Sequence, residues 1–121
     1  METVGGMFAL GLLGHLLGDY ILQNDHMATD KKKSSAVCAF HCLIWTICVG
    51  TITGISGQWI IFWLFATHFA IDRWSFIPYF MDHWSGQAVF REKLGPWSTI
   101  IVDNIWHMVT IYIAVRWELW T

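Results

Sequence analysis

VGGMFALGLLGHLLGDYIL, residues 4–22, is an apolar stretch that contains two ionisable residues, His15 and Asp19. An α-helix rises about 1.5 Å per residue, so about 20 residues cross a hydrocarbon core about 30 Å thick. The stretch is therefore long enough to form a transmembrane helix. His15 and Asp19 lie one helical turn apart, which places both side chains on the same face of that helix.

Three further apolar segments of similar length follow, at residues 36–52, 59–77 and 97–117. Pro78 is expected to end the third segment, and Pro96 suits the first turn of the fourth. Four strands could not close a barrel, so backbone hydrogen bonding in lipid favours helices for all four segments. The predicted fold class is all-α, a four-helix transmembrane bundle.

The composition supports this class. The chain is 55% hydrophobic and 13% charged, whereas soluble domains are about a quarter charged. Its three cysteines are an odd number without a C-x-x-C pair, which argues against a disulfide framework. We therefore expect one transmembrane domain over residues 1–121; the alternative is a soluble bundle with unusually apolar helices. No basic patch suggests a nucleic-acid partner.

The charges between the segments predict the orientation. Lys31, Lys32 and Lys33 follow the first segment, and Arg91 and Lys93 precede the fourth, whereas residues 53–58 carry no charge. The positive-inside rule then makes the two basic loops cytoplasmic and places both termini outside. The three consecutive lysines are expected to contact anionic lipid headgroups.

Ionisable residues recur inside the apolar segments at one predicted depth. The third segment repeats the His-x-x-x-Asp order of the first, the fourth has Asp-x-x-x-His, and the second holds one histidine. The order inverts where the chain direction inverts, so the helical rise places every group toward the cytoplasmic end. The predicted polar layer consists of His15, Asp19, His41, His68, Asp72, Asp103 and His107.

Imidazole and carboxylate groups converging within a helical bundle are typical ligands of a divalent metal. All seven residues of the layer are candidate ligands for one or two ions, with zinc as the expected metal. Asp19, Asp72 and Asp103 are also candidate catalytic bases for a metal-dependent hydrolase of a lipid-linked or phosphate-bearing substrate. The alternatives are hydrogen bonds that join helices, a proton or ion relay, a b-type haem site and a non-catalytic interaction protein.

Four residues near the cytoplasmic ends are candidate substrate contacts: Arg73, Gln23, Asp25 and His26. Arg73 could instead extend to the lipid headgroups. The Asp25-His26 pair follows the first His-x-x-x-Asp motif, as Asp82-His83 follows the second. The bundle could therefore consist of two related helical hairpins.

GHLLGDYILQNDHMA, residues 14–28, resembles the N-terminal signature of a family of small bacterial and phage membrane proteins, domain of unknown function 3307. His41, His68 and Asp72 match later positions of that family. The resemblance implies an integral protein of the bacterial inner membrane, and it implies no activity. His26 stands where family members often have tryptophan. The sequence is also compatible with a homo-oligomer.

Overall fold

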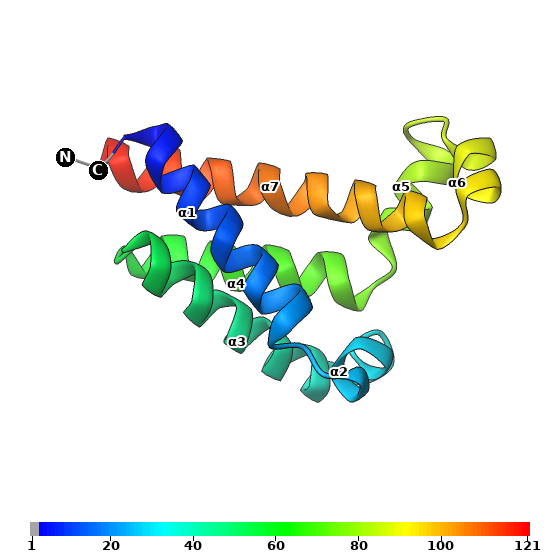
Figure 1. Cartoon of the computed structure of the whole chain (residues 1–121), viewed down its shortest axis with the longest axis horizontal. Coiled ribbons are helices and arrows are strands. Elements are labelled where there is room, and N and C mark those ends of the chain that lie inside the picture. Colours follow the sequence, from blue (N-terminus) through cyan, green and yellow to red (C-terminus); the bar gives the residue numbers. More distant parts are fainter. Residues whose placement is uncertain (1–2) are drawn as a thin grey trace.

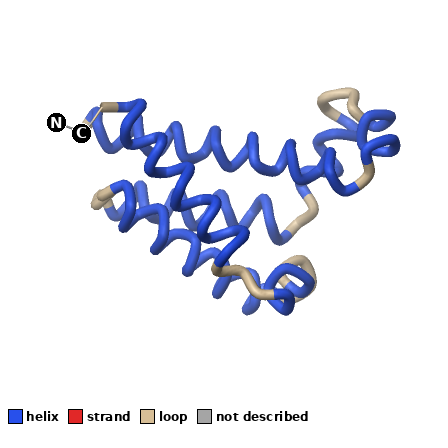
Figure 2. Tube along the Cα trace, viewed as in Figure 1, coloured by secondary structure: helices blue, strands red, loops and turns tan. Residues whose placement is uncertain are grey.

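The computed structural model describes residues 3–121, which are mostly helical and contain no strand. Short turns join the helices (Figure 2). The elements in chain order are α1 (Val4–Leu16), the π-helix η1 (Leu17–Ile21), α2 (Asp25–Asp30), α3 (Ser35–Thr53), α4 (Gln58–Arg73), α5 (Phe76–His83), α6 (Ala88–Leu94) and α7 (Pro96–Trp120). The predicted all-α class is confirmed.

The four longest elements, α1, α3, α4 and α7, lie side by side along the molecule (Figure 1). The termini and the α3–α4 turn lie at one end, and α2, α5 and α6 lie at the other. Both basic loops of the sequence are therefore at the same end of the molecule. This is the relative arrangement that the loop charges predicted.

Three segments are long and apolar enough to cross a membrane: Val4–Ile21, Ser35–Thr53 and Pro96–Trp120. The third expected segment differs, because α4 ends at Arg73 and α5 continues at an angle of 70°. Pro78 does not end a helix; it lies in the first turn of α5, where a missing backbone N–H costs little. The break is at Ser75, whose backbone is left-handed with φ 48°. The number of candidate spans rises to four when the bent pair is taken as one.

Two short helices, α2 and α6, lie where the sequence predicted loops. The Asn24 side chain accepts a hydrogen bond from Met27 N at 2.8 Å and so caps α2. The buried Met27 then attaches this polar helix to the bundle. Arg91 in α6 forms a salt bridge with Asp82 in α5, at 2.6 Å.

The distribution of side chains differs from that in a soluble protein. Apolar side chains such as Leu13, Phe40 and Ile105 are half exposed on the outside of the long helices. Inside, four histidines and Asp72 are almost completely buried. Ionisable groups inside and a continuous apolar exterior are what a lipid environment favours.

Glycines bring α1 and η1 against the backbone of α3. A Cβ on Gly14 would lie 2.9 Å from Val49 Cα, and one on Gly18 would lie 2.8 Å from the Trp45 ring. Gly14 and Gly18 therefore form a small-residue contact of the kind that lets helix backbones approach closely, and the partner is α3. This close approach brings Asp19 to the side chains of α3 and α4.

Candidate metal centre

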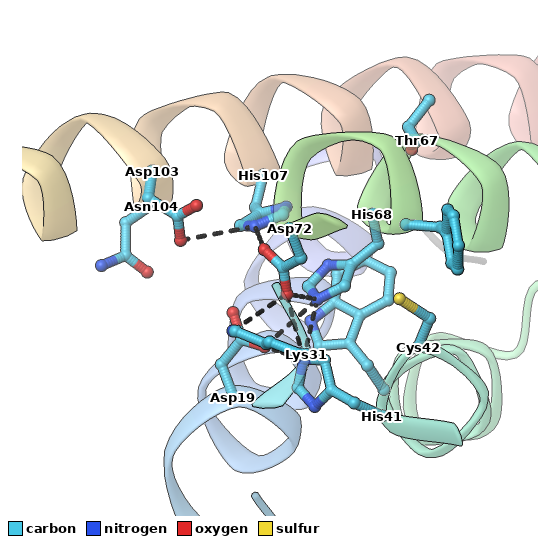
Figure 3. A network of polar contacts seen from close by, with 12 residues as sticks. Asp19, Lys31, His41, Cys42, Thr67, His68, Asp72, Asp103, Asn104 and His107 are labelled. Atoms are coloured by element: carbon cyan, nitrogen blue, oxygen red, sulfur yellow. Dashed lines mark hydrogen bonds and ion pairs between the residues drawn. The ribbon is translucent and has the colours of Figure 1, made fainter. Parts of the chain in front are cut away.

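Four buried side chains from three separate parts of the sequence converge at one point. They are Asp19 from η1, His41 from α3, and His68 and Asp72 from α4 (Figure 3). His41 Nε2 lies 3.0 Å from Asp19 Oδ1 and 3.2 Å from Asp72 Oδ2. His68 Nε2 lies 3.3 Å and 3.0 Å from the same two oxygens.

These distances match the donor set of a tetrahedral metal site. The two Nε2 atoms are 3.1 Å apart, so five of the six pairwise distances between the four ligand atoms lie between 3.0 and 3.3 Å. Ligands about 2.0 Å from a zinc ion stand about 3.3 Å from one another at the corners of a tetrahedron. Two imidazole nitrogens and two carboxylate oxygens also suit iron and manganese.

A second group adjoins the first and shares one carboxylate with it. Asp19, Asp103 and His107 also offer ligand atoms within 4.8 Å of one another. His107 Nε2 lies 3.4 Å from Asp103 Oδ2 and 3.3 Å from Asp72 Oδ1. Asp72 therefore directs Oδ2 at the two histidines of the first group and Oδ1 at His107 of the second. The arrangement can accept one ion or two neighbouring ions.

Aromatic stacking sets the orientation of the histidine rings. The His68 ring stacks on Trp45 and on His107, with ring centroids 4.1 Å apart in each pair. The Nδ1 atoms of His41, His68 and His107 are buried without a hydrogen-bond partner among the described residues. Ring packing therefore fixes the orientation of these histidines. In most metal sites a hydrogen bond from the ligating histidine has that role.

His15 lies beside the centre but outside both groups. Its Nδ1 accepts a hydrogen bond from Trp45 Nε1–H at 3.0 Å, and its Nε2 bonds Asn104 Oδ1 at 2.7 Å. Its nearest contact with Asp19 is longer, 3.5 Å. Both ring nitrogens are occupied within the protein, so His15 is the one predicted ligand that the structure does not direct at a metal position.

Lys31 enters the centre from the turn after α2. Its ammonium lies 3.0 Å from Asp72 Oδ2, and Lys32 Nζ donates to the Asp72 backbone oxygen at 3.2 Å. Burial lowers the pKa of Lys31, but the neighbouring Asp72 and Asp19 carboxylates outweigh it and raise the pKa, so Lys31 stays charged at neutral pH. Lys31 and Lys32 were predicted to contact lipid headgroups; the structure directs both at Asp72.

A cavity of about 410 Å³ opens onto the carboxylate side of the centre. It lies at the end of the bundle that carries the basic loops. None of the buried histidines lines it, so a molecule in the cavity would meet the carboxylates first. The lining residues are Asp19, Tyr20, Gln23, Ala28, Lys31, Lys32, Asp72, Ile77, Pro78, Thr99, Ile100 and Asp103.

The sequence model of the family described as Protein of unknown function (DUF3307) matches residues 7–121. The chain belongs to the DUF3307 family. The match includes every residue of both candidate groups. No curated protein and no solved structure matches the chain. The family description supplies no activity, so a function for this DUF3307 protein has to come from its own geometry.

The predicted substrate contacts of this DUF3307 protein divide into two sets. Gln23 lines the cavity and donates to the Asp19 backbone oxygen at 2.9 Å. Asp25 and His26 are exposed on α2 and do not line it. Arg73 does not line the cavity either, and its guanidinium donates to Ser35 Oγ at 3.1 Å and to the Lys32 backbone oxygen.

Sequence reasoning missed three residues around this DUF3307 centre: Lys31, Trp45 and Asn104. Trp45 and Asn104 carry no charge, so a search for ionisable residues in apolar segments does not select them. Lys31 is next to two other lysines, and such a basic run indicates the orientation of a protein in the membrane. A helical projection could have found Trp45, because it lies one turn from His41 on the same face of α3.

Proposed function

We propose that this protein is a membrane-embedded metal-binding protein that hydrolyses a phosphate-bearing or lipid-linked substrate. The observation that carries the proposal is the near-tetrahedral donor set of Asp19, His41, His68 and Asp72, which is buried and whose two carboxylates line a cavity. Burying two carboxylates beside two imidazoles is costly unless cations compensate the charge. Lys31 compensates one carboxylate, and a divalent ion compensates the rest.

The positions of the residues assign them separate roles. A bound divalent ion would polarise phosphoryl oxygens and make water more acidic. Asp103 is about a quarter exposed and lines the cavity, so it can accept a proton from a water there. His107 contacts both Asp103 and Asp72 and orients these two carboxylates. Lys31 places a positive charge beside any anion that enters.

A proton or ion relay through the bundle has less support, because the polar layer is closed toward the termini. A cluster that includes Met7, Val49, Leu64 and Ile111 fills that half of the interior. The buried Thr53 hydroxyl in the same half donates to its own helix, at Val49 O, and continues no path. A site that opens toward one side suits catalysis better than transport.

Elemental analysis of protein purified in mild detergent without chelator tests the proposal. We expect wild type to contain at least one equivalent of zinc, manganese or iron per chain. His41→Ala and His68→Ala each remove one of two imidazole ligands and should lower the metal content at least tenfold. His26→Ala and His83→Ala change exposed histidines and are the matched controls, with unchanged metal content.

The absence of metal from wild type after gentle preparation, and after incubation with excess ion, would overturn the proposal. Full occupancy in both His41→Ala and His68→Ala would show that the ion is held elsewhere. Thermal unfolding of each variant, followed by circular dichroism, separates ligand loss from misfolding. A folded variant without metal supports the assignment.

A further inference from the structure

A chain of hydrogen bonds leads from the core to the cavity. The chemistry of the side chains determines which atom donates and which accepts in each bond. The Trp45 indole N–H can only donate, so His15 Nδ1 must be the acceptor and Nε2 must carry the proton. His15 Nε2–H then donates to Asn104 Oδ1. The Asn104 amide nitrogen donates to Ile100 O and to the Tyr20 hydroxyl oxygen, at 2.9 and 2.7 Å.

The Tyr20 hydroxyl is the end of this chain. Its oxygen already accepts from Asn104, so its own hydrogen is free to donate. Among residues 3–121, no acceptor lies within hydrogen-bonding distance of that O–H. Tyr20 lines the cavity, and the π-helical turn of η1 carries it next to Asp19. The fold therefore supplies an oriented donor without a protein partner.

The charge around the cavity depends on the metal. Asp19, Asp72 and Asp103 outnumber Lys31 and Lys32 by one charge, so the lining is net negative without an ion. One divalent ion makes it net positive by one. The ion would also neutralise the negative charge of the Asp72 carboxylate, which Lys31 neutralises when no ion is bound. An anion should therefore bind with the metal and not without it.

The remaining walls of the cavity are apolar, from Ile77, Pro78 and Ile100. Tyr20 is also half exposed, and the neighbouring Ile21 is 71% exposed on the outer surface of the bundle. The backbones of η1 and α7 do not pack against each other beside this opening, where the two elements are joined by the Asn104–Tyr20 hydrogen bond. A ligand with a charged head and an apolar tail can therefore place the head in the cavity and the tail along the lipid-facing surface.

We infer that the cavity binds the phosphate group of a lipid, with the Tyr20 hydroxyl and the Lys31 ammonium as its hydrogen-bond donors. This inference rests on the proposed function, since the metal ion supplies the positive charge that anion binding in the cavity requires. It goes further by assigning two recognition residues, by choosing a lipid over a water-soluble phosphate, and by making ligand binding depend on the metal.

Calorimetric titration of zinc-loaded protein in a neutral detergent tests the inference. The probes are dioctanoyl phosphatidic acid, dioctanoylglycerol, which lacks the phosphate, and inorganic phosphate. We expect the phosphatidic acid to bind, the dioctanoylglycerol not to bind, and chelator-treated protein to bind at least tenfold more weakly. Tyr20→Phe and Lys31→Met should each weaken binding about tenfold, the value of one hydrogen bond to a charged ligand.

The matched controls are Tyr79→Phe and Lys33→Met, which change exposed residues outside the cavity lining and should bind as wild type does. Tyr20→Phe should keep full metal content, which separates recognition from metal binding. Wild-type affinity in Tyr20→Phe, or equal affinity without metal, would overturn the inference and leave the metal site intact. Inorganic phosphate binding as tightly as the lipid would overturn the choice of a lipid. A wild type that takes up no metal would overturn the proposed function itself.

Discussion

At the scale of single residues, Asp72 connects every part of the centre. One carboxylate oxygen faces His41, His68 and Lys31, and the other faces His107. A carboxylate with two oxygens committed to different neighbours holds three helices and the turn after α2 in one arrangement. Asp103, by contrast, contacts only His107 among the ionisable groups of the described chain.

This difference predicts different outcomes for two isosteric substitutions. Asp72→Asn removes one of the four ligands of the first group and leaves the Lys31 ammonium without its partner, so metal content should fall to background. Asp103→Asn leaves all four residues of the first group in place, so at least one ion should remain. Elemental analysis of the two purified variants measures this. An ion lost from Asp103→Asn and kept by Asp72→Asn would contradict the assignment.

At the scale of elements, the centre depends on how closely α1 and η1 approach α3. The Cβ positions at Gly14 and Gly18 are already filled by Val49 and Trp45. Trp45 in turn stacks on His68 and donates to His15. A shift of α1 away from α3 would therefore move a ligand-orienting ring as well as Asp19.

Gly14→Ala should destabilise the protein by about 1–3 kcal/mol, because its methyl group meets backbone atoms that cannot turn aside. Gly50→Ala is the matched control, since a Cβ there meets nothing within 4 Å. It should be neutral or stabilise by up to about 1 kcal/mol, as expected in a helix interior. Thermal unfolding of the two variants gives the comparison. Equal stabilities would mean that α1 and α3 are not in backbone contact.

At the scale of the whole molecule, the bundle has two unlike ends. The end with the termini is filled by apolar side chains, and the end with α2, α5 and α6 carries the cavity and the basic loops. The positive-inside rule predicts that the second end faces the cytoplasm. A ligand would then reach the centre from the cytoplasmic leaflet.

Cysteine labelling of the protein in intact cells tests this orientation. The three native cysteines are first replaced by alanine. A single new cysteine is then introduced at an exposed position, either Ser85→Cys at the end with α5 and α6 or Thr121→Cys at the end with the termini. A membrane-impermeant maleimide should label Thr121→Cys in intact spheroplasts and Ser85→Cys only after permeabilisation. The opposite pattern would place the cavity outside and reverse the predicted topology.

The sequence by itself determined the features that depend on local periodicity. The spacing of His15 and Asp19, and of His68 and Asp72, places each pair on one helix face in any fold that keeps the helices. Segment length and composition likewise predicted the long helices, because burial in lipid requires about that many apolar residues. The candidate ligands were found this way because an ionisable group in such a segment needs a partner.

Only the tertiary structure decided which of those groups meet. His15 shares its helix face with Asp19, yet Trp45 and Asn104 occupy its nitrogens, because helix rotation is set by the packing of glycines against α3. Lys31 enters the centre because the cap at Asn24 forms a helix that no charge pattern predicts. Distances between helices decide which polar partner each group meets. Periodicity within one helix carries no information about those distances.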